Sequence, residues 1–229
     1  MKKIFVIEGT DGSGKQTQTE LTYTKLKKDN IPVFRTSFPN YESKSSEPVK
    51  MYLNGELSTN ANDIKEKPAS VLYAVDRFIT YTTMIKPYYE DDSTLILLDR
   101  YVSSNLLHQG AKIIARNEPY ENLDEYQKWL YNLEFEDIGI PKPSKVFFLY
   151  LPAKEAIKAM DTRKNKITHE DKKDIHESDN SHIFNAAKSG YYLANKLGWN
   201  IINCLDSNGD RRSPEDINEE IYSILKSEL

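Results

Sequence analysis

The sequence predicts an α/β protein in which helices cover both faces of a mostly parallel central sheet, giving three layers. Short apolar segments rich in β-branched and aromatic residues alternate with longer segments that have helical spacing. A glycine-rich turn joins the first apolar segment to the first helical one, as expected where a buried strand leads directly into a helix. At 229 residues the chain can form one substantial core, so we expect a single domain over residues 1–229.

The elements follow one another in a regular order. Strands are expected at residues 4–7, 31–37, 94–98, 145–151 and 200–204, because each is a short apolar run beside turn-forming or polar residues. The first helix is expected over 15–28 and ends where Asp29 and Asn30 follow. A long helix is expected over 69–89, and further helices over 123–134, 153–161, 182–197 and 214–229.

The charge balance gives no support for a nucleic-acid or membrane partner. The chain has 31 Lys and Arg against 35 Asp and Glu, for a net charge of -4, so a local cluster must hold any phosphate. The single cysteine, Cys204, cannot form an internal disulfide or a thiolate metal site. No apolar run reaches the roughly 18 residues of a membrane span, and the run before Glu8 is too short for a signal peptide, so we expect a cytoplasmic protein.

A phosphate-binding loop is the strongest local motif. Its sequence, GTDGSGK from Gly9 to Lys15, follows the first strand and opens the first helix. Glycines let consecutive backbone N–H groups face one anion, the helix N-terminus adds positive partial charge, and the lysine can reach the β and γ phosphates. The alternative is a glycine turn that binds no ligand. We expect ATP to be bound here, by Gly9, Asp11, Gly12, Ser13, Gly14, Lys15, Gln16 and Thr17.

The loop departs from the usual motif at one position. A serine or threonine hydroxyl ordinarily follows the lysine and binds the Mg²⁺ that bridges the phosphates, whereas this chain has Gln16. Thr17 is a poor substitute, because one residue along a helix turns the side chain by about 100°. We therefore expect the amide oxygen of Gln16, or water, to complete the magnesium shell.

A polar stretch interrupts the alternation of strands and helices near residues 162–180. It contains Arg163, Lys164, Lys166, Lys172 and Lys173 among many acids. A mobile lid that closes over ATP is the functional interpretation, and a solvated surface loop is the alternative that composition alone favours.

Four segments, in order, resemble the thymidylate kinase family of nucleoside monophosphate kinases. They are Glu8 to Lys15, Phe38-Pro39, Ala74-Val75-Asp76-Arg77, and Asp99-Arg100-Tyr101 followed by Ser104 and His108-Gln109-Gly110. The resemblance covers nearly the whole chain. It implies the three-layer P-loop kinase fold, ATP as phosphoryl donor, Mg²⁺ as cofactor, thymidine monophosphate as acceptor, and a homodimer.

The resemblance also implies roles for individual residues. Asp11 would contact the 3′ hydroxyl of the acceptor, Arg77 and Arg100 would hold its phosphate, and Tyr73 would stack on the thymine ring. Gln109 would contact the base edge, because an amide can both donate and accept. The remaining acceptor-site residues would be Phe38, Pro39, Tyr101, Ser104 and His108. Lys15, Arg163 and Asp99 would be catalytic, with Asp99 also near the magnesium.

Three positions depart from the family's pattern. His108 stands where a tyrosine is frequent, which puts discrimination against ribose in doubt. Gly12 stands where one branch of the family has an arginine, so the lid must supply that charge, and Arg163 is the best candidate before Lys164 and Lys166. Ser144 stands where an acidic residue is usual.

Other interpretations stay open at this point. The chain could be a kinase for another nucleoside monophosphate or for a deoxynucleoside, or a non-catalytic nucleotide-binding protein. The paired arginines favour a phosphorylated acceptor over a nucleoside. His169, His176 and His182 have no metal-binding spacing, and we expect all three to be exposed.

Overall fold

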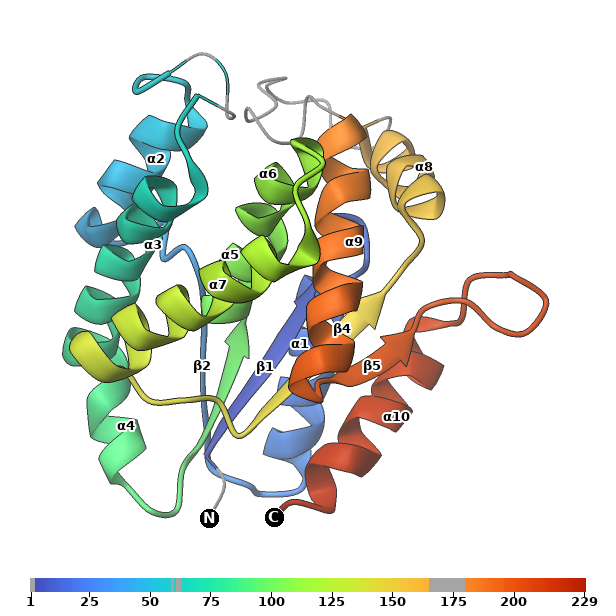
Figure 1. Cartoon of the computed structure of the whole chain (residues 1–229). Coiled ribbons are helices and arrows are strands. Elements are labelled where there is room, and N and C mark those ends of the chain that lie inside the picture. Colours follow the sequence, from blue (N-terminus) through green and yellow to red (C-terminus); the bar gives the residue numbers. More distant parts are fainter. Residues whose placement is uncertain (1–2, 59, 61–62, 165–179) are drawn as a thin grey trace.

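The computed structural model describes residues 3–58, 60, 63–164 and 180–229, and the side chains of 160–164 are not part of that description (Figure 1). In chain order the elements are β1 (Ile4–Gly9), α1 (Lys15–Lys28), β2 (Val33–Ser37), η1 (Lys44–Ser46), α2 (Glu47–Leu53), α3 (Glu66–Thr80), η2 (Tyr81–Ile85), α4 (Lys86–Glu90), β3 (Leu95–Asp99), α5 (Val102–His108), α6 (Gly110–Ala115), α7 (Tyr120–Tyr131), η3 (Asn132–Asp137), β4 (Lys145–Tyr150), α8 (Ala153–Lys164), α9 (Asn180–Leu197), β5 (Asn200–Asn203) and α10 (Pro214–Lys226).

The strands form one sheet in the order β2-β3-β1-β4-β5, and all four neighbouring pairs of these described strands are parallel. The predicted three-layer α/β fold is therefore confirmed (Figure 1). Parallel neighbours need a crossover connection, and the helices between the strands provide it. Since β1 pairs with β3 on one side and with β4 on the other, the loop that follows β1 lies at the middle of the sheet.

The two faces of the sheet are set by alternation along each strand. In β1, Phe5 and Ile7 belong to one core with Leu26 of α1 and Ile221 of α10. Successive side chains of a strand point to opposite faces, so the intervening residues of β1 belong to a second core. That core includes members of α5, α7 and α9: Leu106, Leu123 and Leu193.

The helices differ from the prediction in two ways. The expected long helix over 69–89 is a continuous helical run made of α3, the π-helical turn η2 and α4. The short helices α2, α5 and α6 were not predicted. Among the described helices, none combines the length and apolar character that a membrane crossing requires.

This topology decides where a site can form. The strands β1 and β3 are neighbours, and they end at Gly9 and at Asp99 on the same edge of the sheet. In an open parallel sheet, ligands bind in the crevice beyond the carboxyl ends of the strands. The glycine-rich loop and Asp99-Arg100 are thereby brought together, although about 90 residues separate them in the sequence.

Candidate functional site

The glycine-rich loop turns sharply between β1 and α1. Gly14 is the N-cap of α1 with φ 101°, a left-handed conformation that suits glycine. A Cβ at Gly9 would lie only 2.8 Å from the Leu149 carbonyl oxygen and 2.6 Å from Ser13 Oγ. Lys15 opens α1 and is 7% exposed, with Nζ donating to the Thr10 carbonyl at 2.9 Å. The loop thus wraps around its own lysine, as a phosphate cradle does.

One carboxylate oxygen joins the loop to the strand beside it. Lys15 Nζ lies 3.5 Å from Asp11 Oδ1, and Arg100 Nη2 donates to the same oxygen. Burial alone would raise the pKa of Asp11, but the charges of Arg100 and Lys15 outweigh it and hold that pKa well below the usual range. Burial, reinforced by Arg100, lowers the pKa of Lys15. Two cations therefore converge on one anionic group at the carboxyl edge of the sheet.

Arg100 is held in place by its backbone and by both ends of its guanidinium. Its φ is 67°, a left-handed value that is uncommon for a residue other than glycine and typically costs about 1–3 kcal/mol. Its N–H donates to the Ile7 carbonyl at 3.0 Å, and its Nη1 lies 3.0 Å from His108 Nε2. Such strain is found at functional sites when the surroundings enforce it.

Glu8 is a buried support that the sequence analysis did not assign. Its Oε1 accepts from the Gly9 N–H at 2.9 Å, and its Oε2 accepts from Ser103 Oγ at 2.8 Å and Ser104 Oγ at 2.9 Å. Burial raises its pKa against the opposing charges of Arg100 and Lys15. The predicted acceptor residue Ser104 is thus bound to the strand that leads into the phosphate loop. In the sequence, a glutamate between an apolar strand and the first glycine of the loop could have indicated this supporting role.

Several buried polar atoms around the loop lack a hydrogen-bond partner among the described residues. They are Thr10 Oγ1, Ser13 Oγ and Asp99 Oδ1. Buried polar atoms are normally satisfied, so unsatisfied ones at a loop of this kind point to a polar ligand. Burial raises the pKa of Asp99. Gln16 and Thr17 are exposed at the start of α1, so neither side chain is enclosed with Asp99.

Phe38 is placed by the end of β3. Its N–H donates to the Asp99 carbonyl at 3.0 Å, the Phe38-Pro39 peptide is cis, and its ring packs on Tyr101 with centroids 5.7 Å apart. Tyr101 is itself buried and donates its hydroxyl to the Pro141 carbonyl at 3.0 Å. Tyr101 therefore supports Phe38 from the core, whereas Pro39 is half-buried at the surface of the site.

Arg77, predicted to hold the acceptor phosphate, is already paired with a buried carboxylate. Arg77 Nε and Nη2 donate to the two carboxylate oxygens of Glu134, each at 2.6 Å, and both side chains are buried. Nη1 donates to the Tyr101 carbonyl at 3.5 Å. Since the Nε and Nη2 edge of Arg77 is used by Glu134 and the side chain is buried, Arg100 is the better placed of the two arginines for a phosphate at this site.

The predicted base-contacting residues lie on α3 and at the junction of α5 and α6. Tyr73 is half-buried beside Tyr52, with ring centroids 6.3 Å apart in an edge-to-face arrangement. Gln109 is fully buried, and neither Nε2 nor Oε1 has a partner among the residues that the structure describes. An amide in that state is available to pair with a polar ligand edge.

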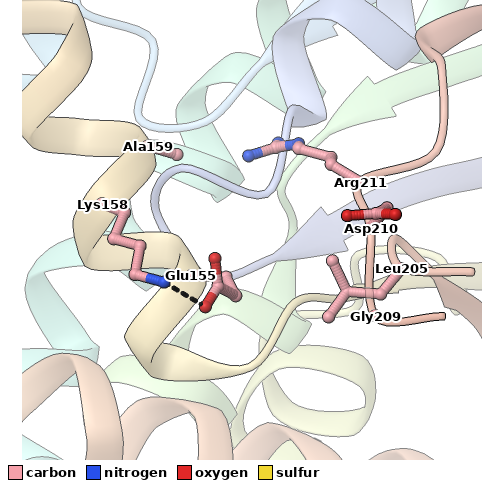
Figure 2. Close-up of a pocket in the computed structure, with 7 residues that line it drawn as sticks. All are labelled: Glu155, Lys158, Ala159, Leu205, Gly209, Asp210 and Arg211. Carbon is pink, nitrogen blue, oxygen red and sulfur yellow. Dashed lines mark hydrogen bonds and ion pairs between the residues drawn. The ribbon is translucent and has the colours of Figure 1, made fainter.

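A pocket of about 290 Å³ adjoins the phosphate loop near Gly12. Glu155, Lys158 and Ala159 of α8 line one wall, and Leu205, Gly209, Asp210 and Arg211 line the other. Figure 2 shows the Arg211 side chain extending from the segment after β5 toward α8. Its Nη2 donates to the Gly12 carbonyl at 2.8 Å, so this pocket adjoins the loop. Arg211 was not among the predicted site residues, because only the fold brings it to residue 12.

Two further predictions concern the polar stretch and its flanks. His182 was expected to be exposed, and this is wrong: it is 9% exposed and lies against His108. The predicted lid at 162–180 lies almost entirely outside the described residues. The side chains of Arg163 and Lys164 and all of Lys166 are also outside them.

Comparisons with known proteins agree with this geometry. A family model described as "Thymidylate kinase" matches residues 7–202. The "Thymidylate kinase" of Halothermothrix orenii is 35% identical over 111 residues, which cover 48% of this chain and 51% of that protein, so the chain spans about half the length of that relative. The "Probable thymidylate kinase" of Thermococcus onnurineus is 26% identical over 227 residues, 98% of each chain. The "Thymidylate kinase" of Mycobacterium tuberculosis is 28% identical over 158 residues, covering 67% and 68%.

Proposed function

Because the chain belongs to the thymidylate kinase family, we propose that it transfers the γ-phosphoryl group of ATP to thymidine monophosphate, giving the diphosphate. The observation that carries the proposal is the shared carboxylate, since Lys15 and Arg100 both approach Asp11 Oδ1. One cation belongs to the phosphate loop and the other to the adjacent strand. A donor phosphate on Lys15 and an acceptor phosphate on Arg100 would therefore meet at one point.

Catalysis by such a site consists of alignment and charge stabilisation, without a covalent enzyme intermediate. Lys15 would contact the β and γ phosphates of ATP, while the guanidinium of Arg100 would orient the acceptor phosphate. Charge spreads over the transferring oxygens in the transition state, and fixed cations already aimed at them cost no reorganisation. Asp11 holds both cations in place. Its carboxylate is also proposed to accept a hydrogen bond from the 3′ hydroxyl of thymidine monophosphate.

Mg²⁺ fits the chemistry of the residues present. Asp99 Oδ1 is a buried carboxylate oxygen without a partner among the described residues, and hard cations prefer such oxygen ligands. The amide oxygen of Gln16, exposed at the start of α1, or a water molecule would complete the magnesium shell. When bound, the ion would neutralise charge on the phosphate oxygens.

Thymine recognition is assigned to Gln109 and Tyr73. The Gln109 amide has a donor and an acceptor group without a partner in the described part of the chain, and these would match the O4 and N3–H edge of thymine. The half-buried ring of Tyr73 on α3 offers a face for stacking. The pocket lined by Arg211 is assigned to the base and ribose of ATP, because it adjoins the phosphate loop at Gly12, away from Arg100.

An acceptor panel tests the proposal. Purified protein would be assayed for ADP release with ATP, Mg²⁺ and, one at a time, the monophosphates of thymidine, deoxyuridine, deoxycytidine and deoxyguanosine, and thymidine itself. We expect turnover that depends on thymidine monophosphate, with thymidine inactive because it brings no anion to Arg100. The Lys15→Met protein is the control for contaminating kinases. Preference for another monophosphate, or no dependence on any of them, would overturn the assignment.

A homodimer is also proposed, with α3 as the contact. Val71, Val75 and Phe78 are 41%, 40% and 46% exposed, and their spacing places them on one face of the helix. Light scattering should report twice the mass of 26.5 kDa, and Phe78→Asp should give the monomer. A monomeric wild-type protein at micromolar concentration would contradict this.

The free, buried Cys204 and the need for ATP suit a cytoplasmic location.

A further inference from the structure

A pair of histidines extends the acceptor site beyond the residues assigned above. His108 ends α5, and His182 lies in the first turn of α9. His108 Nδ1 lies 3.4 Å from His182 Nε2, and the two ring planes are inclined by only 16°. The distance between the ring centroids is 5.6 Å, which exceeds the distance between the two nitrogens by about two ring radii. The rings therefore meet edge to edge along a hydrogen-bond direction, rather than face to face.

The proton on His108 is fixed by its other neighbour. Arg100 Nη1 lies 3.0 Å from His108 Nε2. A guanidinium has no acceptor and does not lose its proton in proteins, so the imidazole nitrogen that faces it must carry a lone pair. The remaining nitrogen, Nδ1, then carries the proton of the neutral ring and donates to His182. A chain of hydrogen bonds thus connects Asp11, Arg100, His108 and His182 in that order.

The helix that carries His182 is anchored beside this chain. Ser189 Oγ donates to the Leu106 carbonyl of α5 at 2.6 Å. A Cβ at Gly190 would lie 2.8 Å from the Phe148 ring and 2.9 Å from Leu107, so α9 and α5 approach closely there. His182, Ala186 and Ser189 are buried and recur at helical spacing, so His182 lies on the face of α9 that packs on α5. The acceptor nitrogen is thus held by a fixed helix.

We infer that His182 is a positioning residue for the acceptor phosphate. By accepting the Nδ1–H of His108, it keeps the Nε2 lone pair turned toward Arg100, and so holds one side of the guanidinium while Asp11 holds the other. This inference rests on the proposed function for its kinetic consequence, since Arg100 is there assigned to the acceptor phosphate. The histidine network itself exists in the free protein and can be tested there.

The network is tested by ¹⁵N spectroscopy of the histidine rings at a mildly alkaline pH without substrate. We expect His108 as the neutral Nδ1–H tautomer in the wild type and in His182→Gln, whose amide oxygen can replace the accepting Nε2. In His182→Leu, which has no acceptor, the His108 ring is no longer held with Nε2 facing Arg100, so the Nδ1–H signal should give way to a mixture of tautomers. An Nε2–H tautomer for His108 in the wild type would overturn the inference, whatever the protein's activity.

The kinetic arm uses thymidine monophosphate and separates the acceptor from ATP. His182→Leu should raise the KM for the acceptor about three- to tenfold, the usual range for one lost hydrogen bond, with kcat and the KM for ATP within twofold. His182→Gln should restore the acceptor KM. Phe184→Leu, on the exposed side of the same helix, is the matched control and should change nothing.

The two arms distinguish this inference from the proposed function. If the wild type has the predicted tautomer but no activity with thymidine monophosphate, the proposed acceptor is wrong and the histidine network stands. If the wild type is active and a folded His182→Leu protein keeps its acceptor KM, the positioning role is refuted while the kinase assignment stands. Thermal unfolding of each variant establishes that the compared proteins are folded.

Discussion

Lys15 combines a buried position with a charge that the fold does not need for packing. Its Nζ donates to the Thr10 carbonyl and lies beside Asp11, so the ammonium is buried inside the loop. Burial and Arg100 lower its pKa, yet Asp11 and Glu8 favour the charged form. The lysine is therefore a fixed cation inside the loop, surrounded by acceptors that a phosphate would join.

Replacing Lys15 by methionine should remove that cation while keeping the aliphatic stem. We expect kcat to fall by about two to three powers of ten, the usual effect of removing one group that stabilises transition-state charge. The melting temperature should change little, because Arg100 still pairs with Asp11. Steady-state kinetics and a thermal melt check both statements. Retention of near-normal turnover would mean that another cation contacts the γ-phosphate.

The ion pair between Arg77 and Glu134 belongs to the scale of elements, because it joins α3 to η3. Glu134→Gln would leave the guanidinium buried beside a neutral amide. Removing one partner of a buried pair typically costs about 3–5 kcal/mol, so we expect a loss of that size in the free energy of unfolding. Urea titration measures it. Glu47→Gln, which removes an exposed pair with Lys50, is the control and should cost about 1 kcal/mol or less. A similarly small loss for Glu134→Gln would mean that water reaches Arg77.

Lys112 of α6 anchors the segment between α2 and α3. Its Nζ donates to Tyr52 Oη at 2.9 Å and to the Ile64 carbonyl at 2.5 Å, and burial lowers its pKa to about 8 from 10.5. A neutral amine still has two N–H groups for these acceptors. Between pH 8 and 10.5 the unfolded chain therefore binds more protons than the folded one, and the free energy of unfolding rises with pH in that window.

The Lys112→Met protein should lose this rise. Relative to the wild type, its stability curve between pH 8 and pH 10 should be flatter by about 2 kcal/mol, since each pKa unit corresponds to about 1.4 kcal/mol. Denaturant titrations at several pH values give the difference, in which other titrating groups cancel. Lys142→Met, at an exposed site, should leave the slope unchanged. Parallel wild-type and Lys112→Met curves would show that Lys112 titrates normally.

Arg163, in the last turn of α8, carries the prediction that the phosphate loop receives charge from a lid. If Arg163 stabilises the transition state, Arg163→Ala should lower kcat by about two to three powers of ten with little change in ATP affinity. Arg163→Lys should recover only part, because a point charge does not reproduce the guanidinium fork. Full activity of the alanine variant would transfer the role to Lys164 or Lys166, or to Arg211 beside Gly12.

Sequence reasoning succeeded where one element decides the outcome. The apolar runs predicted the strands, because alternate residues of a strand such as β1 pack on opposite faces of the sheet. It missed α5, seven residues long and containing two serines, since so short a segment has little helical signal of its own. The Arg77–Glu134 pair and the burial of His182 depend on contacts 57 and 74 residues apart in sequence. Only packing brings those partners together.

At the scale of the whole molecule, the phosphate loop divides the site into two halves. Arg100, from the end of β3, reaches the loop at Asp11, and Arg211, from the segment after β5, reaches it at Gly12. The sheet order β2-β3-β1-β4-β5 puts β3 and β5 on opposite sides of β1. The proposed acceptor half and the proposed donor half thus lie on opposite sides of β1, with the loop as their common boundary.

This division predicts how two arginine substitutions combine. Arg211→Ala should raise the KM for ATP about threefold to tenfold by removing one hydrogen bond and a charge from the donor pocket, and leave the acceptor KM within twofold. Arg100→Ala should raise the acceptor KM about 10- to 100-fold, as expected for a lost charge-assisted contact, and leave the KM for ATP nearly unchanged.

The double variant distinguishes two independent halves from one coupled site. Arg100 and Arg211 contact different residues of the loop, so the losses in kcat/KM should multiply, meaning that the free energies add to within about 0.5 kcal/mol. Steady-state kinetics on the wild type, both single variants and the double variant measure this directly. A coupling above about 1 kcal/mol would mean that the loop moves as one body when either arginine is lost, because residues with no shared partner otherwise act additively.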